Sequence, residues 1–218
     1  MKVKKVKNTK STHIALVLDK SGSMLRWSKE AIVGFNSQID VIQKNAQMGG
    51  ETTLTIVEFN GGVEVLARAV CASAAKKITN KTYQPEGTTA MRDGVFKAIK
   101  ILEKLDNRGP ETAFLVVVIS DGEENSSNTI TAEALAEKIS GLQNSNRWTF
   151  AYIGANQDLS KVQKTYELYT NNVMSYNTDS SGYKYLYTTS TNSLSNFMSL
   201  RENGTLSTDN YFAPSKNS

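Results

Sequence analysis

Residues that build disulfides, zinc sites and catalytic triads are almost missing from this sequence, which has one cysteine and one histidine among 218 residues. Because Cys71 is alone, an intramolecular disulfide is excluded, and a reducing compartment is compatible with the sequence. We expect this cysteine to be a small buried side chain. With His13 as the sole histidine, histidine-based zinc sites and histidine-dependent triads have almost no basis.

Long apolar segments are absent too. No run of about 18 apolar residues occurs, so we expect no transmembrane helix. The lysine-rich N-terminus lacks the apolar stretch that a secretory signal needs. The sequence therefore predicts a cytoplasmic protein, or a virion component if the chain is phage-encoded.

The common catalytic motifs are not present. The sequence has no Gly-x-x-x-x-Gly-Lys-Ser/Thr loop, no Gly-x-Gly-x-x-Gly after its first apolar run and no Gly-x-Ser-x-Gly elbow. P-loop nucleotide hydrolysis, dinucleotide binding and α/β-hydrolase chemistry each require one of these motifs. We therefore expect a protein that is not an enzyme, with a metal-assisted phosphatase as a third alternative.

The positive net charge comes from one end of the chain. The formal charge is +4, with 25 basic and 21 acidic residues, and five of the lysines lie among the first ten residues. Without those five lysines, 20 basic residues face 21 acidic ones, a balance of −1. A basic body for nucleic acid is thus missing, and nucleic acid is not an expected partner.

What the sequence does contain is an acidic, hydroxyl-rich loop after a hydrophobic run. The run His13–Leu18 is followed by Asp19-Lys20-Ser21-Gly22-Ser23, which is typical of a buried parallel strand opening into a site. In an extended loop, side chains two residues apart point the same way, so Asp19, Ser21 and Ser23 can converge. Carboxylate and hydroxyl oxygens suit Mg²⁺ or Mn²⁺ better than Zn²⁺.

Two later segments supply further oxygen ligands. The apolar run Phe114–Ile119 ends in Ser120-Asp121-Gly122, and a Gly-containing turn at Gly87 carries Thr88 and Thr89 before a helical pattern. Ligands of such sheets bind at the carboxyl ends of the strands, so we expect these segments to meet.

With these three motifs in this order, the chain resembles a von Willebrand factor type A (vWA) domain with a metal-ion-dependent adhesion site (MIDAS). The resemblance covers roughly residues 12–200. It implies that Ser21, Ser23 and one threonine bind the ion directly, while Asp19 and Asp121 hold it largely through water. The helix after the turn favours Thr89 as that threonine, and Thr88 is the alternative. The implied ion is Mg²⁺, with Mn²⁺ or Ca²⁺ as alternatives.

The alternation of apolar strands and amphipathic helices predicts the fold class. We expect a single three-layer α/β/α doubly wound, Rossmann-like domain whose mostly parallel central sheet has one antiparallel edge strand, at Val63–Leu66. The predicted organisation is a basic N-terminal tail (1–11), a vWA domain (12–202) and a polar C-terminal tail (203–218). Helices are expected at about 24–45, 89–105, 131–142, 159–168 and 192–201, and the remaining strands at about 13–18, 54–59, 114–119, 148–154 and 172–176.

Tyrosines gather towards the C-terminus, where seven of the nine lie at Tyr166 or later. The alternating segment Tyr183–Tyr187 reads as a strand or an extended arm. An exposed tyrosine cluster would suit a protein interface, whereas the alternative is packing over the sheet. The sequence leaves both open.

Two functions from different classes follow. The first is a non-enzymatic, metal-dependent protein-binding domain, in which an Asp or Glu of a protein partner completes the ion's coordination. The second is a structural subunit of a phage particle or other larger assembly, in which the metal only stabilises the loops and the tyrosine-rich arm makes the contacts.

Overall fold

The computed structural model describes residues 10–46, 50–155, 158–177 and 179–212. A six-stranded sheet has the order β3-β2-β1-β4-β5-β6, and every neighbouring pair is parallel except β2 with β3. The strands are β1 (Ser11–Asp19), β2 (Glu51–Phe59), β3 (Val63–Cys71), β4 (Thr112–Ser120), β5 (Trp148–Ala155) and β6 (Val173–Tyr176). The predicted fold class is confirmed.

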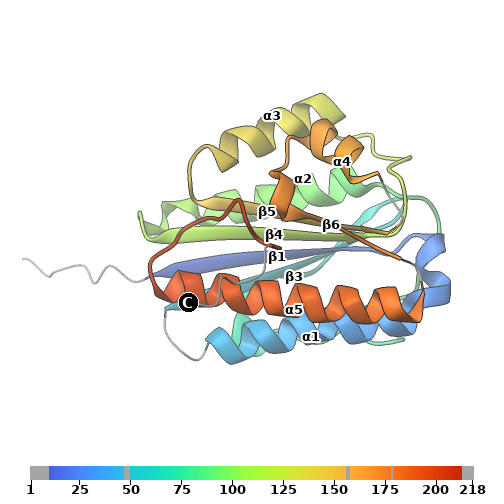
Figure 1. The fold of residues 1–218 in the computed structure, drawn as a ribbon, viewed down its shortest axis with the longest axis horizontal. Helices are drawn as coiled ribbons and strands as arrows, with labels where there is room; N and C mark the ends of the chain where they lie inside the picture. The colour runs from blue at the N-terminus through green and yellow to red at the C-terminus, as the bar shows by residue number, and fades with distance from the viewer. Residues whose placement is uncertain (1–9, 47–49, 156–157, 178, 213–218) are drawn as a thin grey trace, which may run out of the picture.

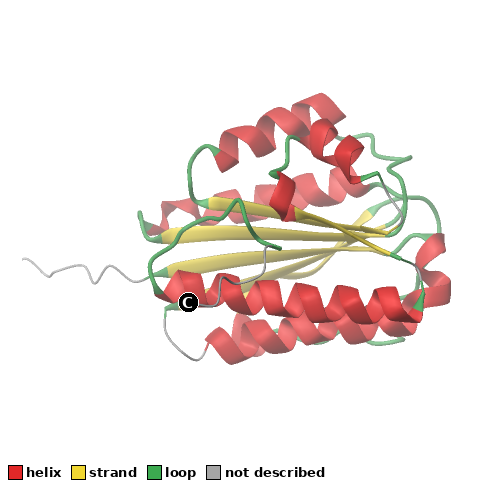
Figure 2. Ribbon diagram, viewed as in Figure 1, coloured by secondary structure: helices red, strands yellow, loops and turns green. Residues whose placement is uncertain are grey.

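Helices cover both faces of this sheet and form the three layers seen in Figure 2. They are α1 (Ser28–Ala46), α2 (Met91–Leu102), α3 (Ala132–Gln143), α4 (Leu159–Tyr166) and α5 (Ser180–Glu202). In Figure 1, α1 and α5 lie on one face, and α2, α3 and α4 lie on the other. A 3₁₀ helix at Gly22–Trp27 precedes α1, which therefore begins at Ser28, later than predicted.

Central strands β1 and β4 supply side chains to two hydrophobic cores. Successive residues of a strand point to opposite faces, so Ile14 and Leu16 join the core under α1 and α5, while Ala15 and Val17 join the core under α2 and α3. Both strands are buried along their whole length. This burial explains why each reads as a continuous apolar run.

The tyrosine-rich segment is helical, so the predicted strand or extended arm at Tyr183–Tyr187 is wrong. It forms the start of α5, where the side chain of Asp179 caps the helix by accepting a hydrogen bond from the Gly182 N–H at 2.7 Å. Tyr183, Leu186 and Leu194 are buried, and their spacing by three and by eight is the helical period. The short alternation within the segment imitates a strand because it spans less than two helical turns.

Close packing of α5 on α1 depends on one glycine. A Cβ on Gly34 would stand 1.5 Å from the Tyr187 ring, so any larger residue would displace this tyrosine. Of the seven late tyrosines, four are buried: Tyr166, Tyr176, Tyr183 and Tyr211. Packing over the sheet, not an exposed arm, accounts for most of the cluster.

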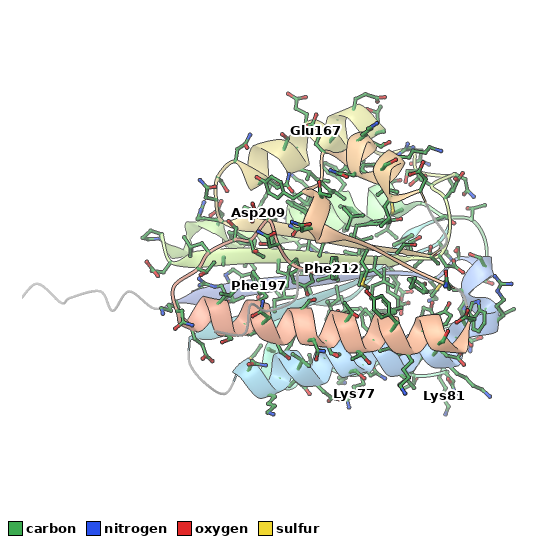
Figure 3. All side chains as sticks on the ribbon, viewed as in Figure 1. Lys77, Lys81, Glu167, Phe197, Asp209 and Phe212 are labelled. Carbon is green, nitrogen blue, oxygen red and sulfur yellow. The ribbon has the colours of Figure 1, made fainter. Side chains whose placement is uncertain are left out.

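The C-terminal segment returns to the sheet, so the tail predicted from residue 203 starts later than expected. Tyr211 is buried, lies 6.3 Å from Phe197 between ring centroids, and its N–H donates to Asn172 Oδ1 at 2.7 Å. Figure 3 shows Phe197 on α5 and Phe212 on this returning segment. Residues 213–218, and residues 1–9 of the predicted N-terminal tail, lie outside the described residues.

Two smaller expectations also differ from the structure. The edge strand β3 continues beyond Leu66 to Cys71, with a shift of its register against β2 near Ile56 and a left-handed φ of 47° at Ala69. Cys71 is exposed on this edge and not buried. None of the helices in the described part of the chain is long and apolar enough to cross a membrane.

Arg201 fastens the end of α5 to the amino ends of the central strands. Its guanidinium donates to Thr12 Oγ1 at 3.1 Å and to the carbonyls of Ser11 at 3.2 Å, Glu111 at 2.8 Å and Thr205 at 2.7 Å. The residue is buried, and through these four hydrogen bonds it joins the end of α5 to the chain at the starts of β1 and β4.

We expect Arg201→Met to lower the free energy of unfolding by about 2–4 kcal/mol, because it removes the four hydrogen bonds of a buried guanidinium that join α5 to the sheet. Urea denaturation followed by circular dichroism measures this. Lys184→Met is the matched control, since Lys184 is exposed on the same helix. Equal urea midpoints for the two variants would contradict the role assigned to Arg201.

Candidate metal site

The predicted site residues meet at the carboxyl ends of β1 and β4, at the right-hand end of the sheet in Figure 1. Asp19 is the last residue of β1, and Asp121 directly follows β4. These two strands are parallel neighbours, with Leu18 opposite Ile119. The sheet therefore places the two carboxylates side by side, as the sequence predicts.

Asp19 is fully buried and held by hydrogen bonds. Its Oδ1 accepts from the Ser21 N–H at 2.7 Å, and its Oδ2 accepts from the Ser120 hydroxyl at 2.6 Å. The Tyr83 hydroxyl donates to the backbone carbonyl of Asp19 at 2.6 Å. Burial raises the pKa of Asp19 to about 6, although the bonds from Ser120 and Ser21 oppose this shift. The site thus holds a carboxylate that lacks a compensating positive charge.

The two serines connect Asp19 to Asp121. Ser21 Oγ lies 3.0 Å from Ser23 Oγ, and the Ser23 hydroxyl donates to Asp121 Oδ1 at 2.6 Å. Burial also raises the pKa of Asp121, against the hydrogen bond from Ser23 and the positive charge of Arg26. The alternate residues of this loop converge as their spacing by two predicts.

Thr89 brings a third hydroxyl to the same point. A Cβ built on Gly122 would stand 3.3 Å from Thr89 Oγ1, 3.6 Å from Ser23 Oγ and 3.8 Å from Asp19 Oδ2. Oxygens from three separate segments therefore surround the space that a side chain at Gly122 would enter. A glycine here keeps these oxygens accessible to a small ligand.

The two adjacent threonines point in different directions. Thr89 is buried, its N–H donates to Asn125 Oδ1 at 2.9 Å, and its carbonyl accepts from the N–H groups of Asn125 and Ser126. Thr88 is exposed, and its hydroxyl lies 2.9 Å from where a Gly61 Cβ would be. Thr88 therefore faces the β2–β3 turn, and Thr89 faces the site.

Two acidic residues hold the loop after β4 onto the start of α2. Glu124 accepts from the N–H groups of Arg92 at 2.9 Å and Ser127 at 2.8 Å, and Asp93 accepts from the Thr129 N–H at 3.0 Å. Burial alone would raise the pKa of Glu124, but these hydrogen bonds lower it overall. These bonds position the segment that contains Asp121.

Several supporting residues were not identified from the sequence. Ser120 stands beside Asp121 in its motif, so its proximity was visible, but its bond to Asp19 depends on the pairing of β1 with β4. Tyr83 and Asn125 reach the site from loops, and no spacing in the sequence indicates them.

The donor set suits a hard divalent cation. It has three hydroxyls and two carboxylates, and no ion pair of 4.0 Å or shorter joins Asp19 or Asp121 to a basic residue in the described ranges. Those ranges also contain no group of three or more His, Cys, Asp or Glu residues that could hold a metal ion. Oxygen ligands with few carboxylates favour Mg²⁺ over softer metals.

The family follows from a comparison with known proteins, in which the model for the von Willebrand factor type A domain matches residues 13–196. The chain belongs to the vWA family. No curated protein sequence matches it significantly. Domains of this family are often involved in metal-dependent protein–protein interaction.

Solved structures share the vWA fold at low sequence identity. The pilus adhesin SpaC from Lactobacillus rhamnosus GG is 14% identical, with a TM-score of 0.59 over 88% of this chain and 31% of its own. Manganese-loaded Plasmodium vivax TRAP protein is 20% identical, with a TM-score of 0.53 over 77% and 69%.

A mussel byssus protein also matches. Proximal thread matrix protein 1 with a zinc-occupied MIDAS motif is 14% identical, with a TM-score of 0.54 over 88% of this chain and 46% of its own. The vWA chain described here spans less than half the length of this protein and of SpaC. At these identities the likeness establishes the fold.

Proposed function

We propose that this vWA domain is a non-enzymatic, metal-dependent protein-binding domain, in which an acidic residue of a partner completes the coordination of a divalent cation. The observation that carries the proposal is the convergence of the Ser21, Ser23 and Thr89 hydroxyls on two carboxylates without a basic partner. Mg²⁺ is the proposed ion, with Mn²⁺ or Ca²⁺ as alternatives. The manganese and zinc named for two proteins of the same fold support a divalent metal.

The distribution of charge explains why a partner's carboxylate would bind. Neutral hydroxyls of Ser21, Ser23 and Thr89 would be the direct ligands, while Asp19 and Asp121 remain behind them and act through water. Neutral ligands cancel little of the charge of a bound divalent cation, so most of its positive charge remains to attract a carboxylate. Asp19 is suited to this indirect role because Ser21 and Ser120 already occupy its oxygens.

The two adjacent threonines offer a sharp test. We expect Thr89→Val to weaken Mg²⁺ or Mn²⁺ binding at least tenfold, because valine has the same shape but no oxygen to replace a lost ligand. Thr88→Val is the matched control and should leave the affinity unchanged, since Thr88 faces Gly61. Isothermal titration calorimetry on the two purified variants measures both affinities.

Equal weakening by both substitutions would show that the threonine turn acts only by folding the loop. Unchanged affinity in Thr89→Val would remove Thr89 from the ligand set. Circular dichroism of both variants without metal checks that the fold is intact, because valine at either position keeps the β-branched shape of threonine.

The alternative hypothesis, a structural subunit of a phage particle or other assembly, depended mainly on an exposed tyrosine-rich arm. That hypothesis needs a tyrosine-rich arm free to make contacts, whereas Tyr176, Tyr183 and Tyr211 are buried in the domain core. Only Tyr169 and Tyr185 are prominently exposed among the described tyrosines. The metal site is the better supported contact surface.

A further inference from the structure

A polar cavity of about 240 Å³ opens near the metal site, between the end of β2, Lys20 after β1 and Glu86 before the threonine turn. Its charged lining consists of Lys20, Glu58, Glu64 and Glu86. Three carboxylates thus face one ammonium group. Asn60 and the β2–β3 turn complete the wall.

Glu58 is the unusual residue of this cavity, because its side chain is 0% exposed and yet only partly paired. Its Oε2 lies 3.0 Å from Lys20 Nζ, while Oε1 is buried and accepts no hydrogen bond from any described residue. A buried carboxylate is costly unless its oxygens are satisfied. The wall of the cavity therefore contains a buried carboxylate oxygen without a hydrogen-bond donor, and this burial raises the pKa of Glu58.

Lys20 cannot satisfy the remaining acceptors. An ammonium group has three donors, and that of Lys20 already contacts Glu58, Glu64 Oε2 at 3.4 Å and the Thr82 carbonyl at 3.4 Å. The Glu86 carboxylate forms no hydrogen bond or ion pair within the described parts of the chain. The cavity therefore has more carboxylates than ammonium groups, and a second cationic group would reduce this excess of negative charge.

The cavity and the metal site share their loops. Lys20 directly follows Asp19, its N–H donates to the Phe59 carbonyl at 2.7 Å, and its carbonyl accepts from the Glu86 N–H at 2.9 Å. A peptide bound at the metal can therefore extend to the cavity, since each further residue of an extended chain adds about 3.3–3.6 Å. A basic residue a few positions from the metal-bound acid can reach Glu64 and Glu86, whose side chains are exposed.

We propose that the partner segment carries a lysine or arginine near its acidic residue, and that this basic side chain enters the cavity lined by Glu58, Glu64 and Glu86. This inference rests on the proposed metal-dependent binding of an acidic residue. It names the partner's chemistry as a segment with one acidic and one basic side chain, recognised by a cation and by carboxylates respectively. Charged groups of opposite sign at fixed spacing would select both sequence and direction of the segment.

The test is a selection of displayed peptides that carry one fixed aspartate flanked by randomised positions, performed on the full chain in Mg²⁺ with elution by EDTA. We expect lysine or arginine to be enriched at one constant offset from the aspartate. The best peptide and its analogue with alanine at the basic position are then compared. Loss of a charge-assisted contact should weaken binding to the wild type by roughly tenfold or more.

The variants locate that contact. In Glu64→Gln and Glu58→Gln the alanine analogue should bind as well as the parent peptide, because the receiving charge is reduced. Glu64 is 62% exposed at its side chain, so its variant tests the inference even if Glu58→Gln fails to fold. Glu123→Gln is the matched control, since Glu123 is an exposed carboxylate beside Asp121 that does not line this cavity. Glu123→Gln should keep the tenfold difference in affinity between the parent peptide and its alanine analogue.

Each adverse result has its own meaning. If peptides bind through their aspartate in Mg²⁺ but no flanking position is enriched in lysine or arginine, this inference is overturned and the proposed function stands. Absence of Mg²⁺-dependent, aspartate-dependent binding would overturn both. A Mg²⁺ titration with two ions per wild-type chain and one per Glu58→Gln chain would also overturn the inference, because the cavity would then hold a metal ion.

Discussion

Excess Mg²⁺ or Mn²⁺ should raise the melting temperature of the wild-type domain by about 5–10 °C over its value in EDTA, and Asp19→Ala should abolish the rise. A ligand that binds only the folded state at a hundred times its dissociation constant adds about 2.7 kcal/mol, which corresponds to that shift for a chain of this size. Asp19 matters because its carboxylate organises the loop through Ser21 and Ser120.

Thermal denaturation by differential scanning fluorimetry, with metal and with EDTA, measures this effect. The quantity to compare is the metal-induced increment, since Asp19→Ala also changes the stability of the metal-free domain by removing two hydrogen bonds. Asp40→Ala is a control, because Asp40 pairs with Lys77 on the surface far along α1, and such exposed pairs contribute little. A rise of equal size in Asp19→Ala would refute the site, as would no rise in the wild type at any metal concentration.

The second large effect concerns pH. Without metal, the domain should lose stability as the pH rises from about 4 to about 6, because burial raises the pKa of Asp19 from 3.8 to about 6. The folded state holds a proton in this range that the unfolded state has released, so the free energy of unfolding falls with rising pH. The shift of about two units corresponds to a loss on the order of 3 kcal/mol. Asp121 acts in the same direction, since burial raises its pKa as well.

Saturating Mg²⁺ should reverse this trend. The cation favours the ionised carboxylates, so metal binding weakens below about pH 6, the pKa of Asp19. Urea denaturation at several pH values, with and without Mg²⁺, measures both slopes. In Asp19→Asn, which cannot ionise, most of the fall between pH 4 and 6 in EDTA should disappear. Equal changes in stability over this interval for the wild type and Asp19→Asn, both in EDTA, would contradict the assignment.

Much of the site could be predicted from the sequence because its residues follow apolar strands directly. Asp19 and Asp121 end two buried runs, and parallel neighbours must bring such ends together. The family resemblance favoured Thr89 but kept Thr88 as the alternative, because adjacent residues in a turn share the same sequence context. Their directions depend on contacts with Gly61 and Asn125, which come from other loops.

The C-terminal third was harder to predict for a related reason. Tyr183–Tyr187 alternates over five residues, and so short a segment fits a strand or a helix equally well. The helical period becomes clear only when the buried residues Leu194 and Phe197 are included. The same helix packs its Tyr187 ring against Gly34 on α1. The polar residues that follow α5 gave no sign that Tyr211 would pack against Phe197.

By itself, the sequence determined the vWA fold class, the order of its strands and helices along the chain and four oxygen-bearing residues of the candidate site, with one of two adjacent threonines as the fifth. These features depend on local patterns: apolar runs, helical periodicity and the residues that directly follow a strand. Only the tertiary structure decided which threonine faces the site, that most of the late tyrosines pack inside and that one buried oxygen of Glu58 lacks a hydrogen-bond donor. Those features arise between segments distant in sequence, whose contacts no local pattern records.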